Sequence, residues 1–119
     1  MTSAGGSNDV LLKLMSASAL RAKVLSENIA NQNVPGYKRK VVLFEELLAQ
    51  RLDQSSRSIE DVKPLIKTDL ETPGSPDGNN VTLELETNSM RENALLYQAY
   101  AAILQTKHEM MRVSISERV

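Results

Sequence analysis

A helix ends and the chain turns sharply within residues 26–38, which read SENIANQNVPGYK. Val34 precedes a proline, so its backbone is biased away from helix and towards an extended conformation. Pro35 and Gly36 suit the two central positions of a type II turn, because proline presets φ at the first and glycine accepts a positive φ at the second. We therefore expect a long helix before this turn and a reversal of the chain within it.

The helix before the turn carries an apolar stripe with heptad-like spacing. No Gly or Pro occurs from Val10 to Ala30. Spacings of four and three alternate along one face, as in a coiled-coil seam. The residues of this stripe are Leu11, Met15, Ser18, Ala22, Leu25 and Ile29. We predict an N-terminal helix over residues 10–32, preceded by a flexible N-terminus over residues 1–9.

A second, longer stripe lies in the C-terminal part of the chain. Its residues are Leu83, Thr87, Met90, Ala94, Tyr97, Ala101, Leu104, His108, Met111 and Ile115. The start of this helix is open, because Val81, Leu83 and Leu85 alternate as in a strand. Ser89 with Glu92 could also form a capping box for a later start. We favour the early start and predict a C-terminal helix over residues 81–119.

The segment between the helices, residues 33–80, contains a turn, a short helix and a flexible connector in this interpretation. Four residues at short helical spacing favour the short helix: Phe44, Leu47, Leu48 and Leu52. Residues 53–80 then hold many turn formers, above all PGSPDGNN at 73–80. Such a run buries too little apolar surface to offset its ordering entropy. We expect at most a short strand there, around Val62–Ile66.

These elements predict a mainly α protein with a single domain over residues 1–119. Long N- and C-terminal helices should pair in coiled-coil fashion, joined by a loop-rich, partly flexible middle region with at most short strands. The single Phe, three Tyr and absent Trp favour a core of aliphatic residues packed helix on helix. Because Ala, Ser and Thr dilute both stripes, the chain should gain much of its stability by assembling with other chains.

Composition excludes several classes of function. Fourteen Lys and Arg balance fifteen Asp and Glu, so no net charge draws the chain to nucleic acid or an anionic membrane. The absence of cysteine excludes disulfides, thiolate nucleophiles and zinc sites of the cysteine type. The most apolar stretch, Ala94–Leu104, falls short of the roughly 20 residues that a membrane span needs. Residues 1–9 have no pattern of a cleaved secretory signal.

Two segments of the sequence resemble those of flagellar axial proteins. The NIAN and PGY motifs within residues 26–38 resemble the end of the N-terminal helix in flagellar rod and hook proteins. The segment DGNNVTLELE at residues 77–86, with Asn93 and Tyr97 after it, resembles the opening of the C-terminal helix in the FlgB family of proximal rod proteins. Two positions depart from the family pattern, which usually has Thr at Val34 and Asp at Thr82.

The resemblance defines the candidate assembly residues. The motif residues are Asn28, Ile29, Ala30, Asn31, Pro35, Gly36, Tyr37, Phe44, Gly78, Asn79, Asn80, Val81, Asn93 and Tyr97. The stripe residues are Leu11, Met15, Ala22, Leu25, Met90, Ala94, Ala101, Leu104, Met111 and Ile115. No catalytic or metal-binding residue and no cofactor is expected.

By this resemblance, the chain is expected to be a structural subunit of the flagellar proximal rod and not an enzyme. Proteins of this family are exported through the flagellar type III apparatus without a cleaved signal, and they pack into the axial shaft that passes motor torque to the hook. The expected location is the periplasmic rod of the basal body. The expected partners are copies of the chain, adjoining rod subunits, the membrane ring and the export gate, with no nucleic acid and no membrane span.

The alternative is a helical adaptor or chaperone that binds partner helices through the same stripes. Length and stripes do not separate it from a rod subunit. The two motifs do, because an adaptor has no need for both of them.

Three features allow a sharper interpretation beside an ordinary one. His108 could ligate a metal or act as a base, but no second histidine or cysteine completes a site, which favours packing at an interface. Residues 38–40 (KRK) could touch nucleic acid or lipid, although three charges are a weak signal, and an acidic neighbour or solvent is the more ordinary surrounding. Residues 10–12 (VLL) could be core, an apolar export signal, or both.

Overall fold

The computed structural model describes residues 3–54 and 58–117 of the chain. The elements follow in the order α1 (Ser3–Ala30), β1 (Lys40–Leu43), α2 (Glu45–Asp53), β2 (Leu65–Thr68) and α3 (Leu83–Glu117). The fold is mainly α, as predicted, with a long helix towards each end of the chain and two short strands between them. The molecule is elongated, with extents of 67 × 29 × 15 Å.

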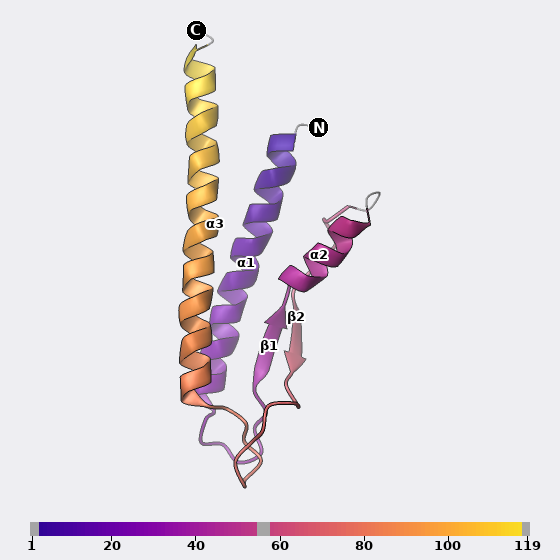
Figure 1. Ribbon diagram of the computed structural model, residues 1–119, viewed down its shortest axis with the longest axis vertical. Helices are drawn as coiled ribbons and strands as arrows, with labels where there is room; N and C mark the ends of the chain where they lie inside the picture. The colour runs from indigo at the N-terminus through magenta and orange to yellow at the C-terminus, as the bar shows by residue number, and fades with distance from the viewer. Residues whose placement is uncertain (1–2, 55–57, 118–119) are drawn as a thin grey trace.

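Helices α1 and α3 form an antiparallel pair (Figure 1). They lie side by side near the turn end of the molecule and diverge towards the two chain termini (Figure 1). The 35 residues of α3 reach about 52 Å at the usual helical rise, against about 42 Å for the 28 residues of α1. The C-terminal end of α3 therefore projects beyond the start of α1 (Figure 1).

The helix boundaries correct one prediction and confirm another. α1 begins at Ser3, so the stretch predicted as flexible, residues 1–9, is helical from residue 3. Each glycine at positions 5 and 6 costs about 1 kcal/mol relative to alanine, but extending a helix that is already formed adds a hydrogen bond per residue without a new nucleus. α1 ends at Ala30, two residues earlier than expected. α3 begins at Leu83, which confirms the early start.

The two strands form an antiparallel sheet with Lys40 opposite Thr68 and Leu43 opposite Leu65. The strand expected around Val62–Ile66 lies three residues later, and its partner β1 was not predicted. Four residues, KVVL, are too few for alternation to be recognised. Val42 of β1 is buried, and β1 packs against α1.

The apolar core lies between α1, α2 and the segment before β2. Its buried members are Ala17, Phe44, Leu48 and Val62, with Val10, Leu14, Leu47 and Ile59 packed around them. Phe44 is only 1% exposed and stands directly before α2, where its carbonyl oxygen accepts the N–H of Leu48 at 2.8 Å. Burial of such a side chain contributes roughly 1.5–3 kcal/mol. This core is small for a molecule 67 Å long. Val24, Leu25 and Val42 are buried outside it, and polar contacts add to their packing towards the turn.

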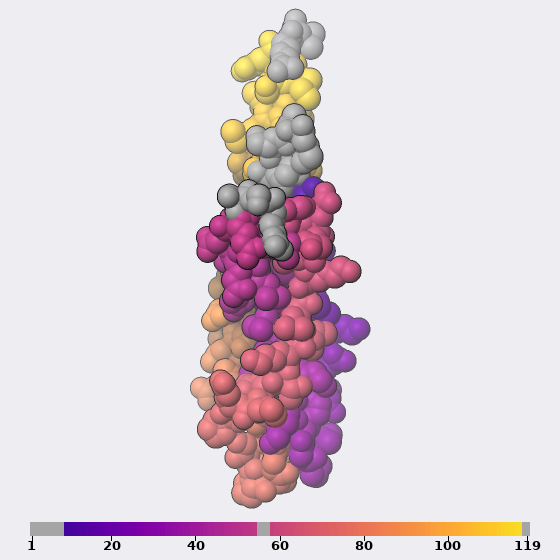
Figure 2. All heavy atoms as spheres, turned by 90° about the vertical axis from the view of Figure 1, so that its right-hand side faces the viewer, coloured from indigo at the N-terminus to yellow at the C-terminus, as the bar shows by residue number. Residues whose placement is uncertain are grey.

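The segment predicted as a connector lies against the helix pair in the part that is described, residues 58–80. Figure 2 views the molecule from the side of the strands, and this rose-to-salmon segment covers the lower front between α1 and α3. Side-chain to backbone hydrogen bonds hold it, including those of Asp69, Asn79 and Asn80. Composition underestimates this order, because it measures apolar burial and not the satisfaction of polar groups.

Candidate functional site

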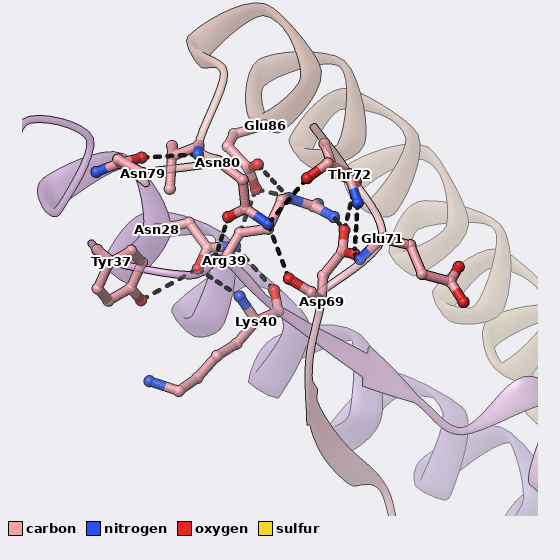
Figure 3. Close-up of polar contacts among 11 residues, drawn as sticks. Asn28, Tyr37, Arg39, Lys40, Asp69, Glu71, Thr72, Asn79, Asn80 and Glu86 are labelled. Atoms are coloured by element: carbon pink, nitrogen blue, oxygen red, sulfur yellow. Dashed lines mark hydrogen bonds and ion pairs between the residues drawn. The ribbon is translucent and has the colours of Figure 1, made fainter. Parts of the chain in front are cut away.

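Four of the motif residues, Asn28, Tyr37, Asn79 and Asn80, meet at a polar junction below the helix pair. The end of α1, the turn after it, the start of β1, the loop at residues 69–80 and the first turn of α3 converge there (Figure 3). We use "polar junction" for the side chains of Asn28, Tyr37, Arg39, Asp69, Asn79, Asn80 and Glu86. Five of the seven residues are almost completely buried: Asn28, Arg39, Asn79, Asn80 and Glu86.

Asn28 uses its whole side-chain amide at the junction. Its Nδ2 donates to the backbone oxygen of Lys40 at 2.8 Å and to Oε1 of Glu86 at 2.9 Å. Its Oδ1 accepts the backbone N–H of Lys40 at 2.9 Å and the hydroxyl of Tyr37 at 3.2 Å. Both donors and both acceptor positions are therefore satisfied. The amide ties α1 to β1, to the turn and to the first turn of α3 (Figure 3).

Arg39 bridges two carboxylates at the centre of the junction. Its Nε and Nη2 donate to the two oxygens of Glu86 at 2.6 and 3.3 Å, and its Nη1 donates to Asp69 Oδ2 at 2.7 Å. Burial would lower the pKa of Arg39, but the hydrogen bonds and charges of the two carboxylates outweigh burial and raise it. The bidentate pair with Glu86, whose side chain is completely buried, is the strong geometry for this interaction.

Asp69 is held as a carboxylate from two sides. The hydroxyl and backbone N–H of Thr72 donate to it at 2.6 and 3.1 Å, and the backbone N–H of Glu71 donates at 2.9 Å. The bonds from Thr72 and Arg39, against the opposing effect of burial, hold the pKa of Asp69 well below its usual range. The loop that follows β2 is thereby fixed to Arg39, the residue directly before β1 (Figure 3).

Asn79 joins the loop before α3 to the end of α1. Its Nδ2 donates to the backbone oxygens of Asn31 and Val34 at 2.9 and 2.7 Å. Its Oδ1 accepts the backbone N–H of Val81 at 2.8 Å. Two backbone carbonyls in the turn directly after α1 are thus satisfied by an asparagine from a distant segment.

Asn80, the next residue, serves the other side of the junction. Its Oδ1 accepts the backbone N–H of Arg39 at 2.7 Å, and its Nδ2 donates to the backbone oxygens of Asp69 and Thr72 at 2.8 and 3.4 Å. The two adjacent asparagines therefore connect different segments, one at the end of α1 and one at the end of β2 (Figure 3).

Two glycines lie together where the turn and the loop cross. Gly36 has φ of 77° and Gly78 has φ of 90°, both in the left-handed region. The N–H of Tyr37 donates to the oxygen of Val34 at 3.2 Å, and with the positive φ of Gly36 this gives the features of the predicted type II turn. A Cβ on Gly78 would lie 3.4 Å from Cα of Gly36, and Lys38 Nζ donates to the oxygen of Gly78.

A second polar cluster, which the sequence did not predict, lies farther up the helix pair. Arg21 of α1 binds both oxygens of Glu45 at 2.6 and 3.1 Å. Its guanidinium also donates to Asn93 Oδ1 at 3.2 Å and to the backbone oxygen of Val42 at 3.1 Å. Burial would raise the pKa of Glu45, but the hydrogen bond from Arg21 and further contacts lower it. This cluster connects α1, β1, α2 and α3.

Asn93 and Tyr100 extend this cluster along α3. Nδ2 of Asn93 donates to the backbone oxygen of Ser18 at 2.8 Å, and the hydroxyl of Tyr100 donates to Glu45 Oε2 at 3.3 Å. Burial and the nearby Glu45 carboxylate raise the pKa of Tyr100. The hydroxyl of Ser18 itself is buried and has no hydrogen-bond partner among the described residues.

The two predicted stripes lie in different surroundings. In α1, Leu11, Ser18 and Leu25 are buried, and Met15, Ala22 and Ile29 are half-buried. In α3, by contrast, Met90, Ala101 and Leu104 are half-buried and the other members of the stripe are exposed. The buried residues of α3 are Glu86 and Asn93.

The stripe of α3 therefore runs beside the line that faces α1, a difference from the expected seam. Glu86, Asn93 and Tyr100 are spaced by seven and make the inward contacts. Each residue turns a helix by about 100°, so the stripe through Ala94 and Tyr97 falls on a neighbouring face. Hydrophobic periodicity missed the inward line because its members are polar. Their spacing of seven was the available signal.

The other candidate residues are placed as follows. Pro35 and Ala30 are exposed near the junction, Val81 joins it through its backbone, and Phe44 belongs to the apolar core. His108 is exposed on α3, and the described residues contain no cluster of three or more acidic, His or Cys residues that could hold a metal. Of the KRK segment, Arg39 is buried between acidic neighbours, which is the ordinary interpretation. No helix among the described residues is long and apolar enough to cross a membrane.

Comparison with known proteins gives consistent relatives. The sequence pattern of the family described as "Flagella basal body rod protein" matches residues 15–38, which include the end of α1 and the turn. The flagellar basal body rod protein FlgB of Bacillus subtilis is 28% identical over 86% of this chain and 87% of its own length. FlgB of Borrelia hermsii is 28% identical over 80% of this chain and 84% of its own, and FlgB of Aeromonas hydrophila is 27% identical over 78% and 80%.

The family pattern over residues 15–38 and these relatives support a structural subunit of the flagellar basal body rod. Among such proteins, the chain is similar to FlgB proteins over most of its length, at 27–28% identity. This similarity implies assembly with other flagellar rod proteins in the basal body, and the rod family is not known as a family of enzymes.

Proposed function

We propose that this chain polymerises by helix packing into the proximal part of the rod and transmits motor torque towards the hook. The observation that supports this proposal most directly is the surface of α3. Its apolar side chains are more than a third exposed at Leu95, Leu96, Tyr97, Ile103, Met110, Met111, Val113 and Ile115. Large apolar side chains left uncovered in this number along one helix are typical of a surface that binds other proteins.

The polar junction has a mechanical part in this proposal. A drive shaft must pass twist between subunits without loss of shape, so the angle between α1 and α3 has to be fixed. Asn28, Arg39 and Glu86 connect both helices to β1 through short, buried hydrogen bonds. Buried polar networks that are fully satisfied rigidify the structure around them. The motif residues thus act in assembly by holding the helix pair in one geometry.

The proposal also covers the domain that acts, its export and the proteins that it contacts in the rod. Residues 1–119 act as one rod-type domain with no catalytic activity, and the chain is exported through the flagellar type III apparatus without a cleaved signal. It then lies in the periplasmic rod, where it contacts copies of itself, adjoining rod subunits, the membrane ring and the export gate. The FlgB names of the relatives support a place in the rod, and the uncovered apolar side chains of α3 support contacts with neighbouring subunits.

Deletion of the gene in a motile host tests the function. We expect cells without swimming and basal bodies without rods, both restored by the wild-type gene. Tyr37→Asp should fail to restore them, because it removes the ring and the hydroxyl that donates to Asn28 Oδ1 and introduces a negative charge in a part-buried position. Tyr37→Phe is the matched control, since it removes only the hydrogen bond at 3.2 Å. Intact rods and normal swimming in the deletion strain would contradict the proposal and favour an adaptor.

A further inference from the structure

A shallow groove runs along the side of the helix pair that carries no sheet. We call it the flank groove. It is lined by Ser18, Ala19 and Ala22 of α1 and by Met90, Asn93, Ala94, Tyr97 and Gln98 of α3. The C-terminal apolar stripe therefore forms one wall of the groove instead of the contact between the two helices.

The chemistry of the flank groove suits an apolar helix. No charged side chain lines it, whereas the groove on the sheet side of the pair is lined by Arg21, Lys40, Glu45 and Glu92 among others. The α1 wall has only small side chains, and small residues let a further helix approach closely while its large side chains fill the space. Ala94 and Tyr97 are exposed, so the α3 wall is open to a partner.

The chain itself carries a helix that fits such a groove. The C-terminal part of α3 diverges from α1, and its last turns project beyond the start of α1 (Figure 1). Residues 103–115 belong to this part of the helix. They expose large apolar side chains at Ile103, Met110, Met111, Val113 and Ile115. Within the described residues nothing covers them. One molecule thus has a groove that no helix occupies and a helix with apolar side chains that are exposed to solvent.

We propose that the flank groove binds residues 103–115 of α3 from a second copy of this chain. The inference rests on the proposed polymerisation and names the two surfaces that would carry it. Groove and projecting end are different surfaces, at different heights of a molecule 67 Å long. A contact between two different surfaces is heterologous, and when its rotation does not close, it generates an open helical filament. The contact buries the exposed apolar side chains of α3 and fills the small-residue wall of α1.

Site-specific photo-crosslinking in the assembled basal body tests this contact. Tyr97, in the groove wall, is replaced by p-benzoylphenylalanine in the full chain, with Ala99 replaced in the same way as the control. Ala99 is exposed on the same helix and does not line the flank groove. After irradiation, we expect the Tyr97 probe to give a band of twice the chain mass, joined to a peptide within residues 103–115. The Ala99 probe should not give this product. A probe at Met90, which also lines the groove, serves if the Tyr97 variant fails to assemble.

The alternative outcomes are distinct. A Tyr97 product with another protein, with a different segment of this chain, or no product from basal bodies that contain the variant overturns the inference and leaves the proposed function standing. Absence of the wild-type chain from isolated basal bodies contradicts the proposed function itself, and the inference falls with it.

Discussion

At the scale of single residues, the loss of Arg39 would leave two carboxylates, those of Glu86 and Asp69, without their counter-charge. Arg39 is 6% exposed, and its guanidinium is shared by Glu86 and Asp69. Removing one partner of a buried ion pair leaves the other charge uncompensated, which costs more than the pair contributes. We therefore expect the polar junction to lose much stability when one charged side chain of a pair is removed, and to lose less when both are replaced by apolar side chains.

We expect Arg39→Met to lower the free energy of unfolding by about 3–5 kcal/mol, because Glu86 then stays buried without a counter-charge. The double variant Arg39→Met with Glu86→Leu should recover a large part of this loss, since it removes both charges. Urea unfolding followed by circular dichroism measures both. Arg91→Met, at an exposed position of α3, is the control and should change stability little. Equal loss in the single and double variants would contradict this account.

Replacement of Ser18 is expected to maintain or raise stability, in contrast to replacement of Arg39. The hydroxyl of Ser18 is buried without a hydrogen-bond partner among the described residues, and an unsatisfied buried group costs about 1–3 kcal/mol. Ser18→Ala should therefore leave the free energy of unfolding unchanged or raise it by about 1 kcal/mol. Ser16→Ala, at an exposed position of the same helix, gives the reference for the change in helix propensity. A clear loss of stability in Ser18→Ala alone would show that the hydroxyl has a partner.

At the scale of elements, α1 places two neighbouring leucines in different surroundings, which the sequence alone did not distinguish. Leu11 is 6% exposed and faces the interior, whereas Leu12 is 50% exposed. Successive residues on a helix differ by about 100°, so adjacent apolar side chains cannot both face the same partner. A role in folding and a role in recognition by the export apparatus can thus be tested separately.

Leu11→Asp should lower the free energy of unfolding by at least about 2 kcal/mol, since it buries an unpaired carboxylate in place of a leucine. Leu12→Asp should leave stability within about 0.5 kcal/mol. Thermal unfolding measures this difference, and swimming of complemented cells adds the functional result. Loss of export with Leu12→Asp at unchanged stability would assign recognition to the exposed position. Normal swimming with both variants would exclude both roles.

At the scale of the whole molecule, stability depends on carboxylates that are ionised in the folded state. Asp69 of the polar junction and Glu45 of the second cluster both have lowered pKa values, through Thr72 and Arg39 for the first and Arg21 for the second. A lowered folded-state pKa means that the unfolded chain binds protons more readily. The stability that these groups contribute is therefore present above their unfolded pKa and is lost as pH falls towards the folded value.

We expect the urea midpoint to be level from neutral pH to about pH 5 and to fall below about pH 4.5, where unfolded Asp and Glu begin to take up protons. Asp69→Asn should weaken this acid dependence, because it removes one of the carboxylates whose pKa is lowered in the folded state. Unfolding curves recorded at several pH values between about 7 and about 3 measure it. An unchanged acid slope in Asp69→Asn would show that Asp69 is not linked to folding.

The sequence by itself determined the helices towards both ends, the short helix after Phe44 and the sharp turn at Pro35 and Gly36. Helical periodicity and turn chemistry depend on residues close together along the chain, so helices and turns can be recognised from a short stretch of sequence. The motifs around Asn28 and at Asn79 and Asn80 also pointed to the region of the polar junction.

Only the tertiary structure decided which side chains meet there and which face of α3 turns inward. Arg39 and Glu86 are 47 positions apart, and Arg21 and Asn93 are 72 positions apart. No local pattern marks a charged or amide side chain for burial, because burial of a polar group is favourable only when distant partners satisfy it. The pairing of β1 with β2 depends in the same way on the approach of two distant segments. Each has four residues, which is too few for a strand pattern to be recognised in the sequence.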